Sequence, residues 1–290
     1  IVYALEQDGI LLREPGIASG GARVAVIYDA LAGHILADAM LAKMGRSEMA
    51  AWLKETASLA LLVGPYPDRH PLGSDTFRAL AGLMPRRVYG QQLWPLLDEA
   101  ARNDALLLAA NLESTYLNAE TVNALRTLVI HPPVGSHDLL DRLQHTRGSS
   151  VHPLNADFLD SVLRPLTVSD RDLRWTEWIR RYHKEALDDL HRMEKRWHHL
   201  EKRSHEDKLR ARWTMWHLTS TVRVLRDQTT RSLYYFGRGD AAALFELTLD
   251  SLTINDPYVF ERMLAASYGV TMAHQLPDAE FAGALASYLI

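Results

Sequence analysis

Five histidines fall along one charged stretch of the sequence and are the first residues that could do chemistry. No two of them are four residues apart, the spacing at which two imidazoles can chelate a metal from one helix. No HExxH motif and no clearly placed carboxylate ligand accompany them, and the chain has no cysteine. We therefore predict no metal site and expect structural or solvated histidines. They are His183, His191, His198, His199 and His205.

Two further arrangements could support acid–base or nucleophilic catalysis. His217 and Ser220 could share one face of a helix, but no GxSxG sequence supplies the exposed serine of a hydrolase. The neighbouring carboxylates Asp188 and Asp189 are adjacent in sequence, so they do not face each other on a helix. The sequence predicts no catalytic residue, and hence no enzyme activity in this chain.

The glycines do not form a phosphate-binding loop. No GxxxxGK[ST] sequence is present, and no GxGxxG follows a strand. Gly20, Gly21 and Ala22 are followed by neither a lysine nor a helix. We predict no cofactor in this chain, and a nucleotide could be bound only with help from residues elsewhere.

A basic block covers residues 171–231. It holds 16 Lys and Arg against 10 Asp and Glu, a net charge of +6, although the whole chain has a net charge of −4. Its tryptophans could stack on bases and its arginines could bind phosphate. The interleaved acids instead favour a solvated, salt-bridged helix. Binding to nucleic acid is therefore not expected.

The composition is that of a folded protein. The chain has 290 residues, 47% of them hydrophobic, which suits one to three domains. No apolar run reaches the roughly 18–20 residues that span a bilayer, and no signal peptide is visible. The chain begins with Ile1 and ends within an apolar helical pattern, so we expect an excised piece of a larger cytoplasmic protein.

The first 46 residues have a character of their own. A helix is expected to end at residues 8–9, and two β-branched or apolar strands, 10–12 and 23–28, are separated by a Gly/Pro-rich loop. A helix over residues 30–43 follows, with Asp29 as its cap. This order of helix, hairpin and helix is typical of the end of a winged-helix domain. The apolar face expected of residues 30–43 consists of Leu31, Ile35, Leu36, Ala39 and Met40.

Beyond residue 46 the strand signals nearly vanish. Helical periodicity with short Pro- and Gly-containing connections predicts stacked helical pairs. The segment HPLGSD at residues 70–75 recurs as HPLNAD at residues 152–157, 82 residues later. That spacing is close to two units of the roughly 40–47 residues of HEAT or armadillo repeats. The expected helices are 49–62, 74–83, 95–108, 122–128, 136–143, 175–204, 218–236, 242–249, 258–268 and 281–290.

Several of these segments together resemble a known family. Residues 5–11 and 23–37 resemble the winged-helix end of STAND NTPases, the NACHT- and NLR-related switch ATPases. The later segments resemble the helical arm of the large bacterial antiviral (Avs-type) members. The pieces that carry this resemblance are residues 152–160, 170–175, 218–221, 225–227 and 255–262.

The resemblance implies an architecture and a role. Residues 1–46 would be the C-terminal part of a winged-helix domain, and residues 47–290 an α-solenoid of HEAT-like pairs in a mainly α fold. The parent would use ATP and Mg²⁺, and its arm would recognise a phage structural protein such as a terminase or portal. Binding would drive homo-oligomerisation and defence. No membrane is implied.

The resemblance also points to particular residues. Related switches place a nucleotide-facing histidine where this chain has Tyr28. A tyrosine departs from that pattern, and an ordinary buried residue of the strand is the favoured interpretation. Arg226 and Asp227 resemble the pair that bridges neighbouring HEAT repeats, and we expect Asp256 and Arg262 to serve inter-repeat contacts too. Independently of the resemblance, a glycine between two helical patterns suggests a hinge. The hinge candidates are Gly45 and Arg46.

Two other functions are compatible with the sequence. One is a generic helical-repeat scaffold that binds proteins without a nucleotide switch. The other is a nucleic-acid-binding arm built on residues 171–231.

Overall fold

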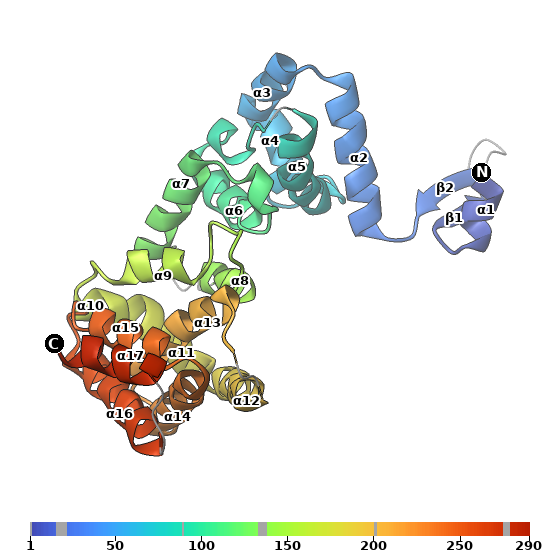
Figure 1. The fold of residues 1–290 in the computed structure, drawn as a ribbon. Helices are drawn as coiled ribbons and strands as arrows, with labels where there is room; N and C mark the ends of the chain where they lie inside the picture. The colour runs from blue at the N-terminus through green and yellow to red at the C-terminus, as the bar shows by residue number, and fades with distance from the viewer. Residues whose placement is uncertain (1, 16–21, 89, 133–137, 200–201, 275–278) are drawn as a thin grey trace. The chain divides into compact units, whose positions relative to one another are not determined.

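The computed structural model describes residues 2–15, 22–88, 90–132, 138–199, 202–274 and 279–290. These residues are mainly helical, which confirms the mainly α part of the predicted fold class (Figure 1). The chain divides into two compact units, residues 1–121 (unit 1) and 122–290 (unit 2). The division falls in the first turn of α7 (Ala119–Ile130). None of the helices described is both long and apolar enough to cross a membrane.

Unit 1 begins with a short helix and a two-stranded hairpin, as predicted. The first helix is followed by Gly9, whose φ of 66° is a conformation that glycine adopts without strain. The strands pair antiparallel with Leu11 opposite Val26, and their connecting residues 16–21 lie outside the described residues. The elements are α1 (Val2–Gln7), β1 (Leu11–Pro15) and β2 (Ala22–Val26).

The remaining helices of unit 1 enclose an aliphatic core in which α2 packs along α5. Fully buried members of this core include Ala37, Leu53 and Leu80. These elements are α2 (Asp29–Lys43), α3 (Arg46–Lys54), α4 (Thr56–Val63), α5 (Gly73–Arg87) and α6 (Glu99–Ala109), with short 3-10 turns at Trp94–Leu96 and Ser114–Tyr116.

The apolar face predicted for α2 is wrong for most of its residues, although Met40 packs against the core. Ile35 is 51% exposed, and Leu31 and Leu36 are each 37% exposed. The buried face instead contains Gly33 and Ala37. A Cβ atom on Gly33 would lie 2.6 Å from the backbone carbonyl carbon of Asp75, so the small residue lets α2 approach α5 closely.

The single helix predicted over residues 49–62 is interrupted at Glu55. This residue is extended (φ −77°, ψ 120°) and separates α3 from α4. In one straight helix Leu53 and Leu59 would point about 120° apart, because six residues turn through about 600°. The break lets both side chains lie in the same core.

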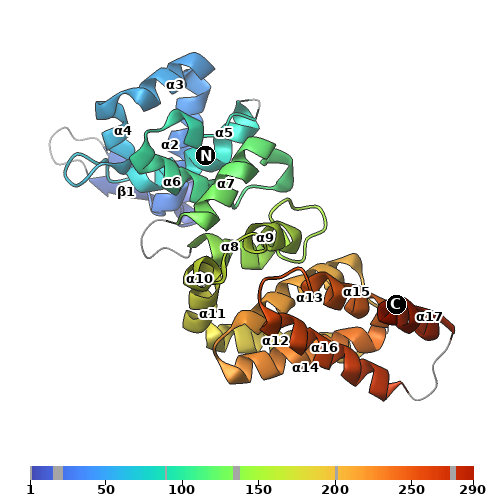
Figure 2. The same ribbon diagram turned by 90° about the vertical axis from the view of Figure 1, so that its left-hand side faces the viewer.

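Unit 2 contains the remaining helices, and Figure 2 shows α14 and α16 beside each other. The continuous helix predicted over residues 175–204 is wrong. A π-helical turn, Asp172–Thr176, precedes α11, and Tyr182 (φ −102°, ψ 28°) separates α11 from α12. The helices are α7, α8 (Asp138–Thr146), α9 (Ala156–Leu163), α10 (Val168–Arg171), α11 (Glu177–Arg181), α12 (His183–His199), α13 (His205–Trp216), α14 (Arg223–Gly239), α15 (Ala241–Ser251), α16 (Pro257–Ala273) and α17 (Ala279–Leu289), with a 3-10 turn at His217–Thr219.

The two HPL segments have the same local structure. In the first copy, the Nδ1 atom of His70 accepts a hydrogen bond from the backbone N–H of Leu72, and the distance is 3.1 Å. In the second copy, His152 accepts from Leu154 at the same distance. Each segment leads directly into a helix, α5 or α9. The recurrence in sequence is therefore also a recurrence of the turn that starts a helix.

Candidate functional site

The five histidines of the charged stretch lie on α12 and at the start of α13. Four are exposed, and only His183 is half-buried, with Nδ1 3.0 Å from the carbonyl oxygen of Arg180. Within the described residues, no group of three or more His, Cys, Asp or Glu could hold a metal ion.

His217 and Ser220 belong to the core of unit 2. Both side chains are 2% exposed. Nδ1 of His217 lies 3.3 Å from the carbonyl oxygen of Thr214, and burial lowers the pKa of His217 to about 4. The hydroxyl oxygen of Ser220 accepts a hydrogen bond from the backbone N–H of Val222. The two side chains thus serve local structure, and no substrate could reach them without a rearrangement.

The tryptophans of the basic block form an aromatic core. Trp175 stacks on Trp178 with ring centroids 5.1 Å apart and meets Trp213 edge to face at 5.2 Å. Trp216 and Trp197 are also at most 1% exposed. These tryptophans therefore pack helices together, and rings buried in this way are not available for stacking on bases.

Two buried carboxylates and one half-buried carboxylate each hold one of these indole rings. Each accepts a hydrogen bond from an indole N–H and so fixes the ring relative to another helix. The pairs are Trp178 with Asp141 at 2.7 Å, Trp216 with Asp160 at 3.0 Å and Trp197 with Asp207 at 3.2 Å.

Asp207 is the most densely bonded of these carboxylates. It is 1% exposed, accepts hydrogen bonds from Arg196, Trp197 and Ser204, and completes a capping box at the start of α13. Burial alone would raise the pKa of Asp207, but the bonds from Arg196, Ser204 and Trp197 outweigh it and lower the pKa to about 2. The carboxylate is therefore ionised at neutral pH.

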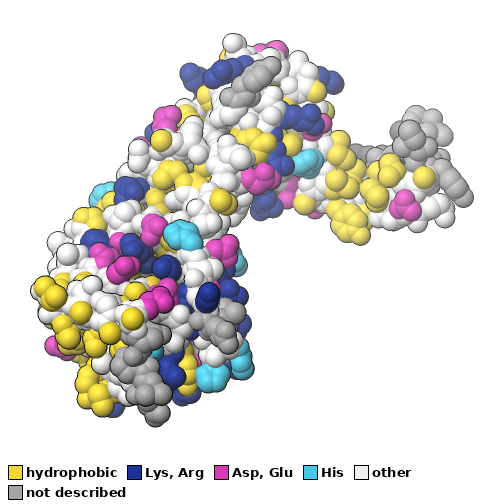
Figure 3. Space-filling model, viewed as in Figure 1, with side chains coloured by type: hydrophobic (Ala, Val, Ile, Leu, Met, Phe, Trp, Pro, Cys, Tyr) yellow, Lys and Arg dark blue, Asp and Glu magenta, His cyan; other side chains and the backbone are white. Residues whose placement is uncertain are grey.

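Several arginines of the basic block pair with acids of the same block. Arg192 shares the buried Asp189 with Arg147, which follows α8, and Arg231 pairs with Glu194 at 2.8 Å. The charged side chains of both signs lie interspersed on the face of unit 2 seen in Figure 3. The salt-bridged interpretation of residues 171–231 fits these contacts better than a continuous surface for phosphate.

Arg203 has a structural role within the same block. It is 9% exposed, and its guanidinium donates to the carbonyl oxygens of Trp197, Tyr235 and Phe236. These carbonyls lie in the last turns of α12 and α14, where helices carry unpaired acceptors and partial negative charge. One arginine thus caps two helices.

The residues assigned to inter-repeat contacts meet at the N-terminal ends of α14 and α16. Nη1 of Arg262 lies 2.7 Å from Oδ1 of Asp227. The ring of Tyr258 lies under the guanidinium carbons of both Arg226, at 5.0 Å, and Arg262, at 5.8 Å. We call Arg226, Asp227, Tyr258 and Arg262 the α14–α16 clamp. The structure brings three of the four predicted residues together here.

The fourth predicted residue, Asp256, takes part in a different contact. Its side chain accepts from the backbone N–H of Tyr258 and so caps α16, and it lies 3.6 Å from the guanidinium of Arg171. Arg171 is fully buried, and it also donates to Asn255 at 2.6 Å and lies over the ring of Trp216. Asp256 therefore connects α16 to α10.

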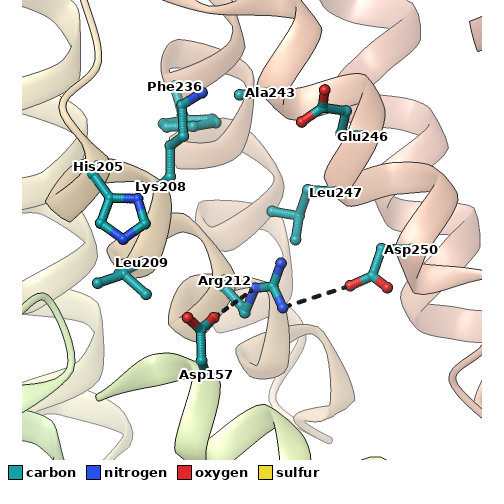
Figure 4. A pocket seen from close by; sticks show the side chains of 10 residues that line it. All are labelled: Asp157, His205, Lys208, Leu209, Arg212, Phe236, Ala243, Glu246, Leu247 and Asp250. Carbon is teal, nitrogen blue, oxygen red and sulfur yellow. Dashed lines mark ion pairs between the residues drawn. The ribbon is translucent and has the colours of Figure 1, made fainter. Parts of the chain in front are cut away.

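A hollow of about 300 Å³ lies between α13 and α15, beside the end of α9. We call it the α13–α15 groove (Figure 4). Leucine, alanine and phenylalanine side chains form its apolar surface, and charged side chains of both signs surround them. Its lining residues are Asp157, His205, Lys208, Leu209, Arg212, Phe236, Ala243, Glu246, Leu247 and Asp250.

Two arginines tie the helices together at one end of this groove. Arg164 donates to Asp160 at 2.9 Å and to Asp250 at 2.8 Å, which links α9 to α15. Arg212 of α13 lies 3.3 Å from Asp157 and 3.8 Å from Asp160. The network fixes the walls of the groove relative to each other.

Sequence reasoning missed this network. The i,i+4 spacing of Asp160 and Arg164 was a visible signal for one ion pair along α9. Arg212 and Asp250 gave no such signal, because they come from other helices.

The nucleotide-facing and hinge candidates lie in unit 1. Tyr28 precedes α2, makes no capping bond and is 61% exposed, so the alternative of a buried strand residue is wrong. Asp29 is the first residue of α2, not its cap. Gly45 is extended between α2 and α3, and Arg46 is the first residue of α3. The break between helices lies where predicted, while motion there stays a prediction.

The domain boundary predicted after residue 46 lies within unit 1. Residue 46 is the first residue of α3, but α2 packs along α5 from the far side of that boundary. The more distinct division of the chain is at residues 121–122.

Comparisons with known proteins gave no relatives. No family model matches the chain, and neither the curated proteins nor the solved structures contain a match. Function therefore has to be argued from the residues themselves.

Proposed function

We propose that this chain is a protein-recognition arm of a STAND-type switch ATPase in antiphage defence, with the end of a winged-helix domain at residues 1–46. In this proposal residues 47–290 form HEAT-like helical pairs. The observation that carries the proposal is the α14–α16 clamp. Arg226 and Asp227 were assigned to contacts between neighbouring helices from their resemblance to a HEAT repeat, and Asp227 pairs with Arg262 of α16.

Two further observations support a repeated helical array. The HPL segments at residues 70–75 and 152–157 begin helices with the same histidine–backbone hydrogen bond. The helices after residue 46 are joined without any strand in the described residues. Stacked helical pairs offer long exposed surfaces that suit recognition of another protein by its shape.

The first residues support the switch part of the proposal. An antiparallel hairpin leads into α2, the order expected at the end of a winged-helix domain. Tyr28 is exposed at the start of α2, where its hydroxyl could reach a nucleotide held by the parent protein. ATP and Mg²⁺ would be bound mainly by other parts of that protein.

The proposed partner is a phage structural protein, a terminase subunit or a portal. Its binding to the helical arm in the cytoplasm would favour homo-oligomerisation of the parent, with Gly45 and Arg46 as the hinge that transmits the change. A generic scaffold without a switch would share the arm but not the nucleotide dependence. A nucleic-acid arm is less well supported, because many arginines of residues 171–231 already pair with acids.

The test is a pull-down with the full parent protein as bait and individually expressed terminase and portal proteins as prey. One phage protein retained in a stoichiometric complex, more strongly with ATP than without, would support the proposal. Retention that is independent of nucleotide would favour the generic scaffold. If no phage protein is retained and RNA or DNA is, with steep salt dependence, the proposal is wrong.

A further inference from the structure

The two long walls of the α13–α15 groove carry opposite charges. His205, Lys208 and Arg212 extend along α13, with spacings of three and four residues that place them on one side of a helix. Glu246 and Asp250 face them from α15 (Figure 4). Leu209, Phe236, Ala243 and Leu247 provide the apolar surface of the hollow.

Most of these charges are already paired. Lys208 lies 3.4 Å from Asp240, and Arg212 lies 3.3 Å from Asp157. Asp250 lies 2.8 Å from Arg164. The basic wall therefore has little unpaired positive charge to offer an anion.

Glu246 differs from the other carboxylates of the groove. It is exposed, and no ion pair or hydrogen bond joins its side chain to another described residue. The groove is lined by three Asp or Glu against two Lys or Arg, so its excess charge is negative when histidine is counted as neutral. By the charge of its lining residues, this groove is complementary to a cation.

We propose that the α13–α15 groove binds an arginine side chain of a partner protein. The aliphatic part of the arginine lies against Leu247 and Ala243, and its guanidinium pairs with the carboxylate of Glu246. This inference rests on the proposed protein-recognition function and identifies one site through which it operates.

Arginine fits this arrangement better than other groups. Its planar guanidinium can bind one carboxylate through two parallel hydrogen bonds, which a lysine ammonium cannot do. A hollow of about 300 Å³ is at the small end of ligand pockets and suits one long side chain. A phosphate or carboxylate ligand would meet Glu246 and would have to displace the acids that hold Lys208 and Arg212.

The test uses a peptide probe and backbone-amide NMR of the 290-residue protein. The probe is the acetylated and amidated tripeptide Leu-Arg-Leu, and the matched control replaces its arginine with citrulline, a neutral group of nearly the same shape. We expect the arginine peptide to shift the amides of α15 around Ala243–Leu247 saturably, with a Kd of about 1–10 mM. The citrulline peptide should bind about tenfold more weakly, because the charge-assisted pair is lost.

Two variants of the protein place the interaction at Glu246. Glu246→Gln should weaken the arginine peptide about tenfold and remove its advantage over the citrulline peptide. Glu261→Gln, at an exposed carboxylate on α16, should leave both affinities unchanged. The proposal is wrong if the two peptides bind equally, if Glu246→Gln has no effect, or if the saturable shifts lie away from α13 and α15.

These outcomes are separable from the fate of the proposed function. If a phage protein binds the parent equally well with Glu246 and with Gln at this position, the proposed arginine site is wrong. The proposed recognition function is then unaffected. If the arginine peptide binds at Glu246 but the parent retains no phage protein, the two proposals have different outcomes. The arginine site is supported, and the proposed function is wrong.

Discussion

The cores of the two units are stabilised by different kinds of side chain. The core of unit 1 is built mostly from aliphatic side chains, with Phe77 as its buried aromatic ring. Its ion pairs lie on the surface, as with Arg86–Glu113, whose side chains are 48% and 66% exposed. The core of unit 2 contains five tryptophans, and several charged side chains are buried beside them. Asp207 and Arg171 are 1% and 0% exposed.

This difference has a consequence for specificity. An aliphatic core is specified by shape, and in unit 1 the decisive feature is the close approach of α2 and α5 at Gly33. In unit 2 four of the five indole N–H groups and the buried carboxylates Asp160, Asp189 and Asp207 have hydrogen-bond partners, and leaving a buried charge unpaired is costly. Unit 2 should therefore be more sensitive to the loss of one polar atom, and unit 1 to the addition of one methyl group.

The largest effect is expected at Asp207. Asp207→Ala removes the acceptor for Arg196, Trp197 and Ser204 and abolishes the capping box of α13. We expect a loss of about 3–5 kcal/mol in the free energy of unfolding of unit 2, because the substitution leaves buried donors unpaired. Urea unfolding followed by tryptophan fluorescence measures it, since five of the seven tryptophans lie in unit 2.

The neighbouring acid provides the control for this prediction. Glu206 pairs with Arg210 at 3.5 Å on the helix surface, and its side chain is 51% exposed. Glu206→Ala should change the free energy of unfolding by at most about 0.5 kcal/mol. Equal losses for the two variants would mean that the buried network does not distinguish unit 2.

Acid should destabilise unit 2 through His217. Burial lowers its pKa from 6.5 to about 4 in the folded state, so the unfolded chain takes up the proton first as the pH falls. Stability from this group is fully present above pH 6.5 and decreases toward pH 4, by at most about 1.4 kcal/mol per pH unit. Urea unfolding at several pH values should show this slope.

Two histidine variants isolate the contribution. His217→Gln should flatten the dependence between pH 6.5 and pH 4, although it lowers stability overall. His191→Gln, at an exposed position on α12, should leave the slope of the wild-type protein unchanged. A slope that persists in His217→Gln would assign the acid sensitivity to other groups.

Unit 1 is expected to respond to an added methyl group. A Cβ at residue 33 would lie 2.6 Å from backbone and side-chain carbons of Asp75, so Gly33→Ala should force α2 away from α5 and cost about 1–3 kcal/mol. Hydrogen exchange of the α2 and α5 amides would detect the loss locally.

Gly82→Ala is the matched control within α5, because nothing lies within 4 Å of its Cβ position. It should stabilise unit 1 by about 0.5–1 kcal/mol. Faster exchange in both variants would contradict the close-approach argument.

Local signals predicted much of this fold. The helix predicted over residues 258–268 corresponds to α16, which begins at Pro257 and has Asp256 as its capping residue. The hairpin and the helix after it were predicted from turn residues and β-branched runs. These features depend on neighbours within a few positions, which a sequence displays directly.

The missed features depend on distant partners. The buried face of α2 was predicted on the side of Leu31 and Ile35, yet α5 packs on the side of Gly33, and periodicity cannot show which side a neighbour occupies. The bond from Arg164 to Asp250 joins residues 86 positions apart. The candidate groove could not be predicted for the same reason, because its walls come from separate helices.

The smallest effect is expected at the α14–α16 clamp. The test asks whether its ion pair contributes as little to stability as an exposed pair or as much as a buried one. The side chains of Asp227 and Arg262 are 49% and 26% exposed, so their 2.7 Å contact is closer in kind to the surface pairs of unit 1. A double-mutant cycle of Asp227→Ala and Arg262→Ala should give a coupling energy of about 0.2–1 kcal/mol, measured by urea unfolding.

Arg223→Ala, at an 84% exposed side chain that also lies near Asp227, serves as the control and should couple more weakly. A coupling above about 2 kcal/mol would show that the clamp behaves as a buried pair, because surface pairs do not reach that value. Unit 2 would then differ from unit 1 in the strength of its surface ion pairs as well as in its core.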